Sequence, residues 1–92
     1  MTETIRRTLT IINVKGLHAR ASARLAEVVE DHDADCEVSK DGLSASGDSI
    51  MGLLMLAASK GTSIEVQTSG PEAAKLADAL ETLVNDRFGE EM

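Results

Sequence analysis

The sequence contains almost no aromatic residues. Phe88 is the one aromatic side chain among 92 residues, and Trp and Tyr are absent. A core must therefore be built from aliphatic side chains, and nucleic-acid bases would have almost nothing to stack on. A single cysteine, Cys36, excludes an internal disulfide. We expect a buried, inert thiol at Cys36 and a cytoplasmic location.

Positive charge is also scarce. Nine Lys and Arg residues against sixteen Asp and Glu residues give a net charge of −7 at pH 7. Nucleic acids and anionic membrane surfaces attract basic faces, so we expect neither as a partner. The longest apolar run, residues 50–58, is too short to cross a bilayer, and the N-terminus has no apolar stretch typical of a secretion signal. No Walker loop, dinucleotide fingerprint or zinc spacing is found, so we expect no resident cofactor or metal.

Alternation of apolar and polar residues predicts four short strands. In the first, Ile5, Leu9 and Ile11 share one face, while threonines and Arg6 occupy the other. The predicted strands cover residues 4–11, 34–39, 43–45 and 63–67, and KDG at 40–42 is typical of a hairpin turn.

Apolar spacings of three and four predict three helices. These run from about His18 to Asp31, from Ser49 to a cap at Gly61, and across residues 73–84. The order is β-α-β-β-α-β-α, and each strand is apolar on one face only. We therefore expect one α+β domain, residues 1–92, in which helices cover one side of a mainly antiparallel sheet.

His18 stands where the first of these helices begins, directly after Gly16 and Leu17. The first backbone N–H groups of a helix have no intrahelical partner and favour an anion. Arg20 adds a permanently charged donor suited to phosphate oxygens, and an imidazole with an unprotonated nitrogen is a nucleophile near neutral pH. These residues can therefore accept and hold a phosphoryl group. On pattern alone, a histidine that only caps the helix or lies in an exposed loop explains them as well.

Two longer motifs give the pattern more weight. GLHARASA at 16–23 resembles the phosphorylation-site signature of the HPr family, the histidine-containing phosphocarriers of the phosphoenolpyruvate-dependent phosphotransferase system. DSIMGLLML at 48–56, with KG at 60–61, resembles the second signature of that family. The resemblance runs from Thr4 to about Phe88. It implies an open-faced β-sandwich with a four-stranded antiparallel sheet covered on one face by three helices.

The resemblance also implies the chemistry. His18 would be phosphorylated on Nδ1 by enzyme I and would pass the group to an enzyme IIA-type acceptor, while Arg20 would steady the phosphate. The protein would be a relay substrate and not a stand-alone catalyst.

The second signature implies regulation and docking. Ser49 aligns with a serine that HPr kinase/phosphorylase phosphorylates in some lineages. Asp48 beside it would oppose the new charge, and either Asp48 or Ser49 can equally serve only as a helix cap. Ala19, Ile50, Met51 and Leu54 would form the face that docks on partners, and we expect the protein to be a monomer.

One residue departs from the family pattern. Ala21 follows HAR where a proline is typical. Alanine forms helices well, so we expect the helix to persist with a looser first turn. The variant points to the nitrogen-related branch of the system, so a mainly regulatory protein that moves no sugar is one alternative. An acyl-carrier-like protein with phosphopantetheine on Ser49 is another, but that family is all-helical and conflicts with four predicted strands.

Overall fold

The protein folds in the predicted β-α-β-β-α-β-α order. A computed structural model describes residues 3–91. The elements are β1 (Glu3–Thr10), α1 (Ala19–Glu30), β2 (Asp35–Lys40), β3 (Leu43–Ser46), α2 (Ile50–Met55), β4 (Ser63–Gly70), α3 (Ala73–Asn85) and a 3₁₀ turn, η1 (Arg87–Gly89).

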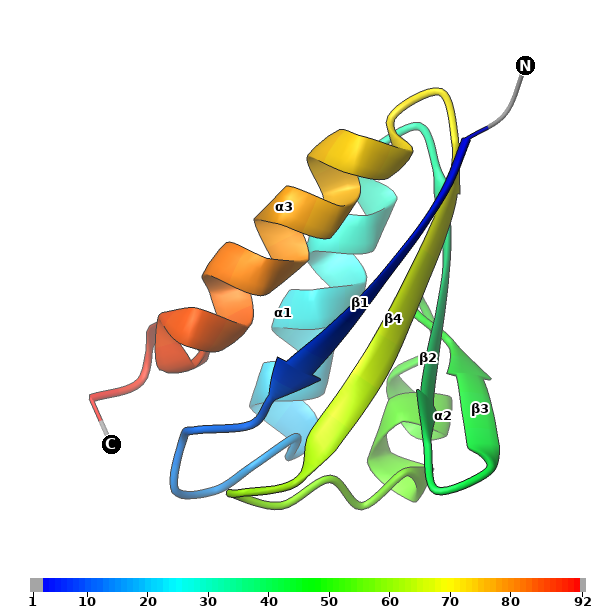
Figure 1. Cartoon of the computed structure of the whole chain (residues 1–92). Helices are drawn as coiled ribbons and strands as arrows, with labels where there is room; N and C mark the ends of the chain where they lie inside the picture. The colour runs from blue at the N-terminus through cyan, green and yellow to red at the C-terminus, as the bar shows by residue number, and fades with distance from the viewer. Residues whose placement is uncertain (1–2, 92) are drawn as a thin grey trace.

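The four strands form one antiparallel sheet in the order β1-β4-β2-β3. The register pairs Leu9 with Ile64 and Val66 with Val38, so apolar side chains gather on one face. Helices α1 and α3 lie side by side over that face, and α2 packs against α1 and β3 (Figure 1). The other face carries polar residues such as Thr8, which is exposed. The open-faced sandwich is therefore confirmed.

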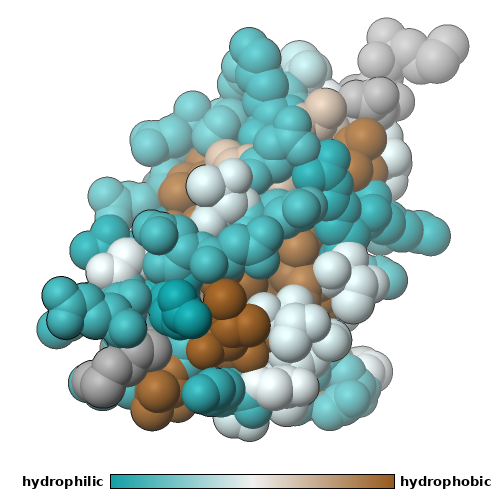
Figure 2. All heavy atoms as spheres, turned by 60° about the vertical axis from the view of Figure 1, so that its left-hand side comes forward, coloured by the Kyte–Doolittle hydropathy of each residue, from teal (hydrophilic) through white to brown (hydrophobic). Residues whose placement is uncertain are grey.

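The core is aliphatic, as the composition requires. Leu25, Leu53 and Leu80 have no exposed surface, and Phe88, the one aromatic, is 1% exposed beneath the end of α3. Cys36 is buried, and burial, with a smaller effect of nearby Asp48, raises the pKa of its thiol to about 12. The prediction of a buried thiol is confirmed, and the raised pKa favours the protonated form at neutral pH. The view toward α3 and the C-terminus shows a mostly hydrophilic surface broken by small, separate hydrophobic areas (Figure 2).

The second helix is shorter than the sequence suggested. It ends at Met55, and Gly61 is not its cap. Leu56 and Ala58 are both buried, and the Ala58 carbonyl accepts a hydrogen bond from the Leu17 N–H at 2.8 Å. The chain leaves the helical path to make these contacts. No helix within residues 3–91 has the length and apolarity to cross a membrane.

Candidate functional site

The loop before α1 is held close to the chain that follows α2. Gly16 has φ = +63°, and a Cβ at this position would lie 2.4 Å from the Ala58 carbonyl oxygen, so only glycine fits. Next to it, the buried Ser22 hydroxyl donates to the Leu17 carbonyl at 3.2 Å. These contacts fix where α1 begins and therefore where His18 stands.

His18 is the N-cap residue of α1. Its Nδ1 accepts a hydrogen bond from the Arg20 backbone N–H at 3.3 Å, and its carbonyl accepts from the Ser22 N–H at 2.8 Å. The capping interpretation of His18 is thus confirmed. The ring can do more than cap the helix, because Nδ1 lies at the N-terminus of α1, where backbone N–H groups favour negative charge.

The other ring nitrogen of His18 contacts a carboxylate from the far end of the chain. His18 Nε2 lies 2.6 Å from Glu90 Oε2, and Glu90 Oε1 accepts from Asn13 Nδ2 at 2.8 Å. The side chains of His18 and Glu90 are 25% and 17% exposed. His18 is therefore held at both nitrogens, by a backbone N–H and by a carboxylate.

Asn13 orients this carboxylate from inside the protein. It has no exposed surface, and its Nδ2 also donates to the Gly16 carbonyl at 2.9 Å. The hydrogen bond from Asn13, more than the contact with His18 and the charge of Lys15, lowers the pKa of Glu90 below its ordinary value, against a smaller opposing effect of desolvation. Glu90 is therefore ionised at neutral pH.

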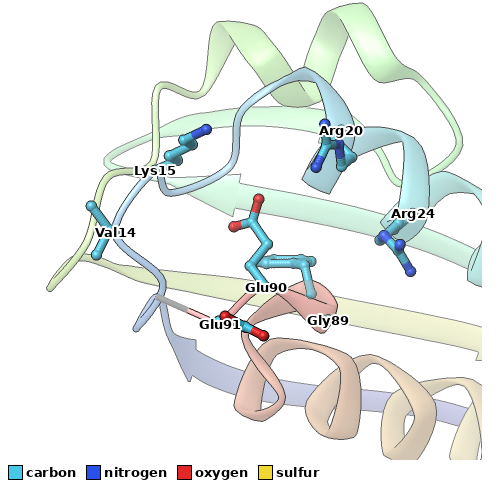
Figure 3. A pocket seen from close by; sticks show the side chains of 8 residues that line it. Val14, Lys15, Arg20, Arg24, Gly89, Glu90 and Glu91 are labelled. Carbon is cyan, nitrogen blue, oxygen red and sulfur yellow. The ribbon is translucent and has the colours of Figure 1, made fainter.

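Cationic side chains surround this carboxylate. Lys15, Arg20 and Arg24 line a pocket of about 280 Å³ together with Glu90 and Glu91. Arg20 and Arg24 approach from α1 and Lys15 from the preceding loop, and the Glu90 carboxylate points between them (Figure 3). Three of the nine cations of an acidic chain thus line the pocket that holds Glu90, the residue in contact with His18. Clustered cations of this kind attract anionic groups.

Ser49 is the N-cap residue of α2, as His18 is of α1. Its Oγ accepts from the Gly52 N–H at 3.0 Å and caps the helix. Asp48 does not cap the helix, since its carboxylate accepts from the Ser46 hydroxyl at 2.5 Å. Ser49 does not line the pocket beside His18.

The predicted docking residues differ in exposure. Ile50 and Met51 are 42% and 71% exposed, and Ala19 is exposed at the first position of α1. Leu54 is half-buried. Met55, which the sequence did not single out, is the most exposed of these large hydrophobic residues at 76%.

Asn13 and Glu90 are the site residues that sequence reasoning missed. Asn13 follows two isoleucines at the end of an alternating strand, where nothing distinguishes it from a loop residue. Glu90 is separated from His18 by 72 positions, and the folding of the C-terminal turn, in which Phe88 is buried, brings it there. No spacing rule connects residues so far apart.

Comparisons with known proteins agree with this fold. Residues 5–86 match the family model described as PTS HPr component phosphorylation site. The chain is 42% identical over 86 residues to phosphocarrier protein HPr of Cupriavidus necator, covering 94% of this chain and 97% of the relative. It is 36% identical over 89 residues to phosphocarrier protein NPr of Escherichia coli K12, covering 96% and 99%. The crystal structure of HPr-C-His from Thermoanaerobacter tengcongensis superposes with a TM-score of 0.91 at 31% identity, covering 96% of this chain and 99% of that one.

The match to the HPr family model, on a four-stranded sheet with a histidine at a helix N-terminus, identifies the class of protein as a phosphocarrier, which relays a phosphoryl group and is not itself a catalyst. The chain belongs to the HPr family of the phosphotransferase system. The all-helical acyl-carrier alternative is wrong, because the sheet is present. The family match ends at residue 86, so Glu90 lies outside it.

Proposed function

We propose that His18 accepts a phosphoryl group on Nδ1 from enzyme I and passes it to an enzyme IIA-type acceptor. The observation that carries this proposal is the position of Nδ1, 3.3 Å from the Arg20 N–H in the first turn of α1. A phosphoryl group bonded to Nδ1 replaces the lone pair that now accepts from this N–H. The N–H is then free to donate to a phosphate oxygen.

The surrounding charge suits a carrier that must also release its cargo. Arg20 offers two parallel donors to phosphate oxygens, and Lys15 and Arg24 add positive charge from the same pocket. All three cations lie at the surface, where solvent moderates their attraction. The phosphate is therefore bound while it remains accessible to solvent and to the next acceptor.

In this proposal, residues 1–92 act as one cytoplasmic, monomeric phosphocarrier domain.

Partners dock, in this proposal, on the apolar surface of α2. Ile50, Met51 and Leu54 supply that surface together with Ala19 of α1, and α2 packs against α1. Exposed apolar side chains gathered on one short helix mark an interaction surface. Met55 extends this docking face.

Ser49 is a candidate second phosphorylation site, for HPr kinase/phosphorylase. A phosphate there would remain at the N-terminus of α2, which favours negative charge, although Asp48 opposes it. The role in regulation instead of sugar transport is a second candidate function. Ala21 favours it, whereas the identity to the NPr, 36%, is lower than the 42% to the HPr of Cupriavidus necator.

The acceptor is tested by mass spectrometry after incubation with phosphoenolpyruvate, magnesium and a cognate enzyme I. The chain has a second histidine, His32, whose Nδ1 is hydrogen-bonded to the Val28 carbonyl at 2.7 Å at the other end of α1. We expect one acid-labile phosphate on the wild type and on His32→Ala, and none on His18→Ala. A labile phosphate on His18→Ala, or none on the wild type, would contradict the proposal.

A further inference from the structure

We propose that Glu90 is a positioning residue that keeps Nδ1 of His18 unprotonated and therefore able to form a bond to phosphorus. This inference rests on the proposed function, in which Nδ1 is the acceptor atom. A neutral imidazole in water exchanges between two tautomers, and in one of them the proton occupies Nδ1. That tautomer cannot accept phosphorus.

Two independent contacts select the other tautomer. An ionised carboxylate can only accept hydrogen bonds, so the 2.6 Å contact between Glu90 Oε2 and His18 Nε2 requires a proton on Nε2. On the opposite edge of the ring, the Arg20 backbone N–H can only donate, so Nδ1 must present its lone pair. Both contacts demand the same arrangement.

The carboxylate of Glu90 is itself held in place. Glu90 Oε1 accepts from Asn13 Nδ2, and the same nitrogen donates to the Gly16 carbonyl. If the Asn13 amide were rotated by half a turn, its Oδ1 would face these two acceptor oxygens, so the amide is fixed in one orientation. The backbone N–H of Glu90 donates to the Arg87 carbonyl at 2.9 Å, and Phe88 is buried in the core. The C-terminal turn therefore holds the Glu90 carboxylate in a fixed position, where it orients the His18 ring.

The same contact serves the transfer step in both directions. The Nδ1 lone pair forms the bond to phosphorus while the bond from phosphorus to the leaving atom of the donor breaks, and that atom keeps the electron pair. The Nε2 proton stays on the ring, and the negative charge of Glu90 offsets the positive charge that the ring gains. On release the electron pair returns to Nδ1, and no proton has to move.

The inference is tested with Glu90→Ala, and Glu27→Ala is the matched control. Glu27 is exposed on α1 and does not line the pocket, and no hydrogen-bond partner is found for its carboxylate among residues 3–91. Long-range proton–nitrogen NMR of ¹⁵N-labelled protein, at a mildly alkaline pH where imidazoles are neutral, distinguishes the two tautomers. We expect one tautomer, protonated on Nε2, in the wild type and in Glu27→Ala, and a mixture in Glu90→Ala.

Phosphoryl acceptance is measured on the same three proteins. Loss of a charge-assisted hydrogen bond should slow acceptance by Glu90→Ala by about tenfold, while Glu27→Ala keeps the wild-type rate. Unchanged ring-nitrogen shifts in Glu90→Ala, or an unchanged rate, would overturn the inference. The NMR readout needs no phosphate, so a wild type that holds one tautomer but accepts no phosphoryl group would refute the proposed function separately.

Discussion

At the scale of single residues, His18 is defined by what holds its two ring nitrogens. The Arg20 N–H and the Glu90 carboxylate restrain the ring before any phosphate arrives. The sequence offered a helix-capping role for His18 as one alternative, because the residue stands where a helical pattern begins, but it did not specify the contact with the Arg20 N–H. It did not predict the contact with Glu90, because a carboxylate 72 positions away is brought there only by tertiary packing.

Glu90 should also make the stability of the protein depend on pH. Its folded-state pKa lies below the ordinary 4.5, first because Asn13 donates to it and also because His18 and Lys15 lie nearby. A carboxyl with a lowered folded-state pKa stabilises the fold fully above its unfolded pKa, and this contribution is lost as the pH falls through the folded value.

Urea unfolding across the acidic range measures this contribution, with Glu90→Gln and Glu91→Gln compared with the wild type. We expect the wild type to exceed Glu90→Gln in unfolding free energy most clearly above about pH 4.5, with the difference shrinking as acid is added. A difference that grows as the pH falls below about 4.5, or one that Glu91→Gln reproduces, would contradict the assignment.

At the scale of elements, the two helix N-termini are built differently. α1 begins at a histidine whose carbonyl and ring both take part in the cap, whereas α2 begins at Ser49, an ordinary capping residue. The starts of both helices followed from the sequence. The end of α2 did not, because burial of Leu56 and Ala58 and a hydrogen bond to Leu17 override the local preference.

Removal of the Ser49 cap should weaken the fold measurably. Ser49→Ala leaves the Gly52 N–H without its acceptor, and we expect a loss of about 1 kcal/mol in unfolding free energy. Ser49→Asp should recover most of it, since aspartate caps helices well. Ser44→Ala, at an exposed position on β3, is the control and should unfold like the wild type. Equal unfolding free energies for Ser49→Ala and Ser44→Ala would show that Ser49 does not stabilise α2.

At the scale of the whole molecule, the sheet and the three-helix layer followed from patterning because each strand is apolar on one face only. Leu9, Val38 and Val66 lie inward as their period of two predicts. The strand order β1-β4-β2-β3 was beyond that reasoning, because alternation fixes which side of a strand is buried and not which strand is its neighbour.

The docking face should matter for transfer and not for folding. Met51 is 71% exposed, so Met51→Glu should leave the fold intact while a charge on the apolar face lowers the rate of phosphoryl transfer from enzyme I. Leu43→Glu, at a 59% exposed hydrophobic position on β3, is the matched control. The rate of phosphoryl transfer is measured by stopped flow. If Met51→Glu and Leu43→Glu both transferred at the wild-type rate, the docking assignment would be contradicted.

The central claim is that His18 carries phosphorus on Nδ1. Phosphorus NMR of the protein with phosphoenolpyruvate, magnesium and catalytic enzyme I tests it most directly. The account predicts a resonance typical of Nδ1-phosphohistidine that is present in the wild type and absent from His18→Ala. A resonance typical of Nε2-phosphohistidine, or no resonance with an active cognate enzyme I, would contradict it.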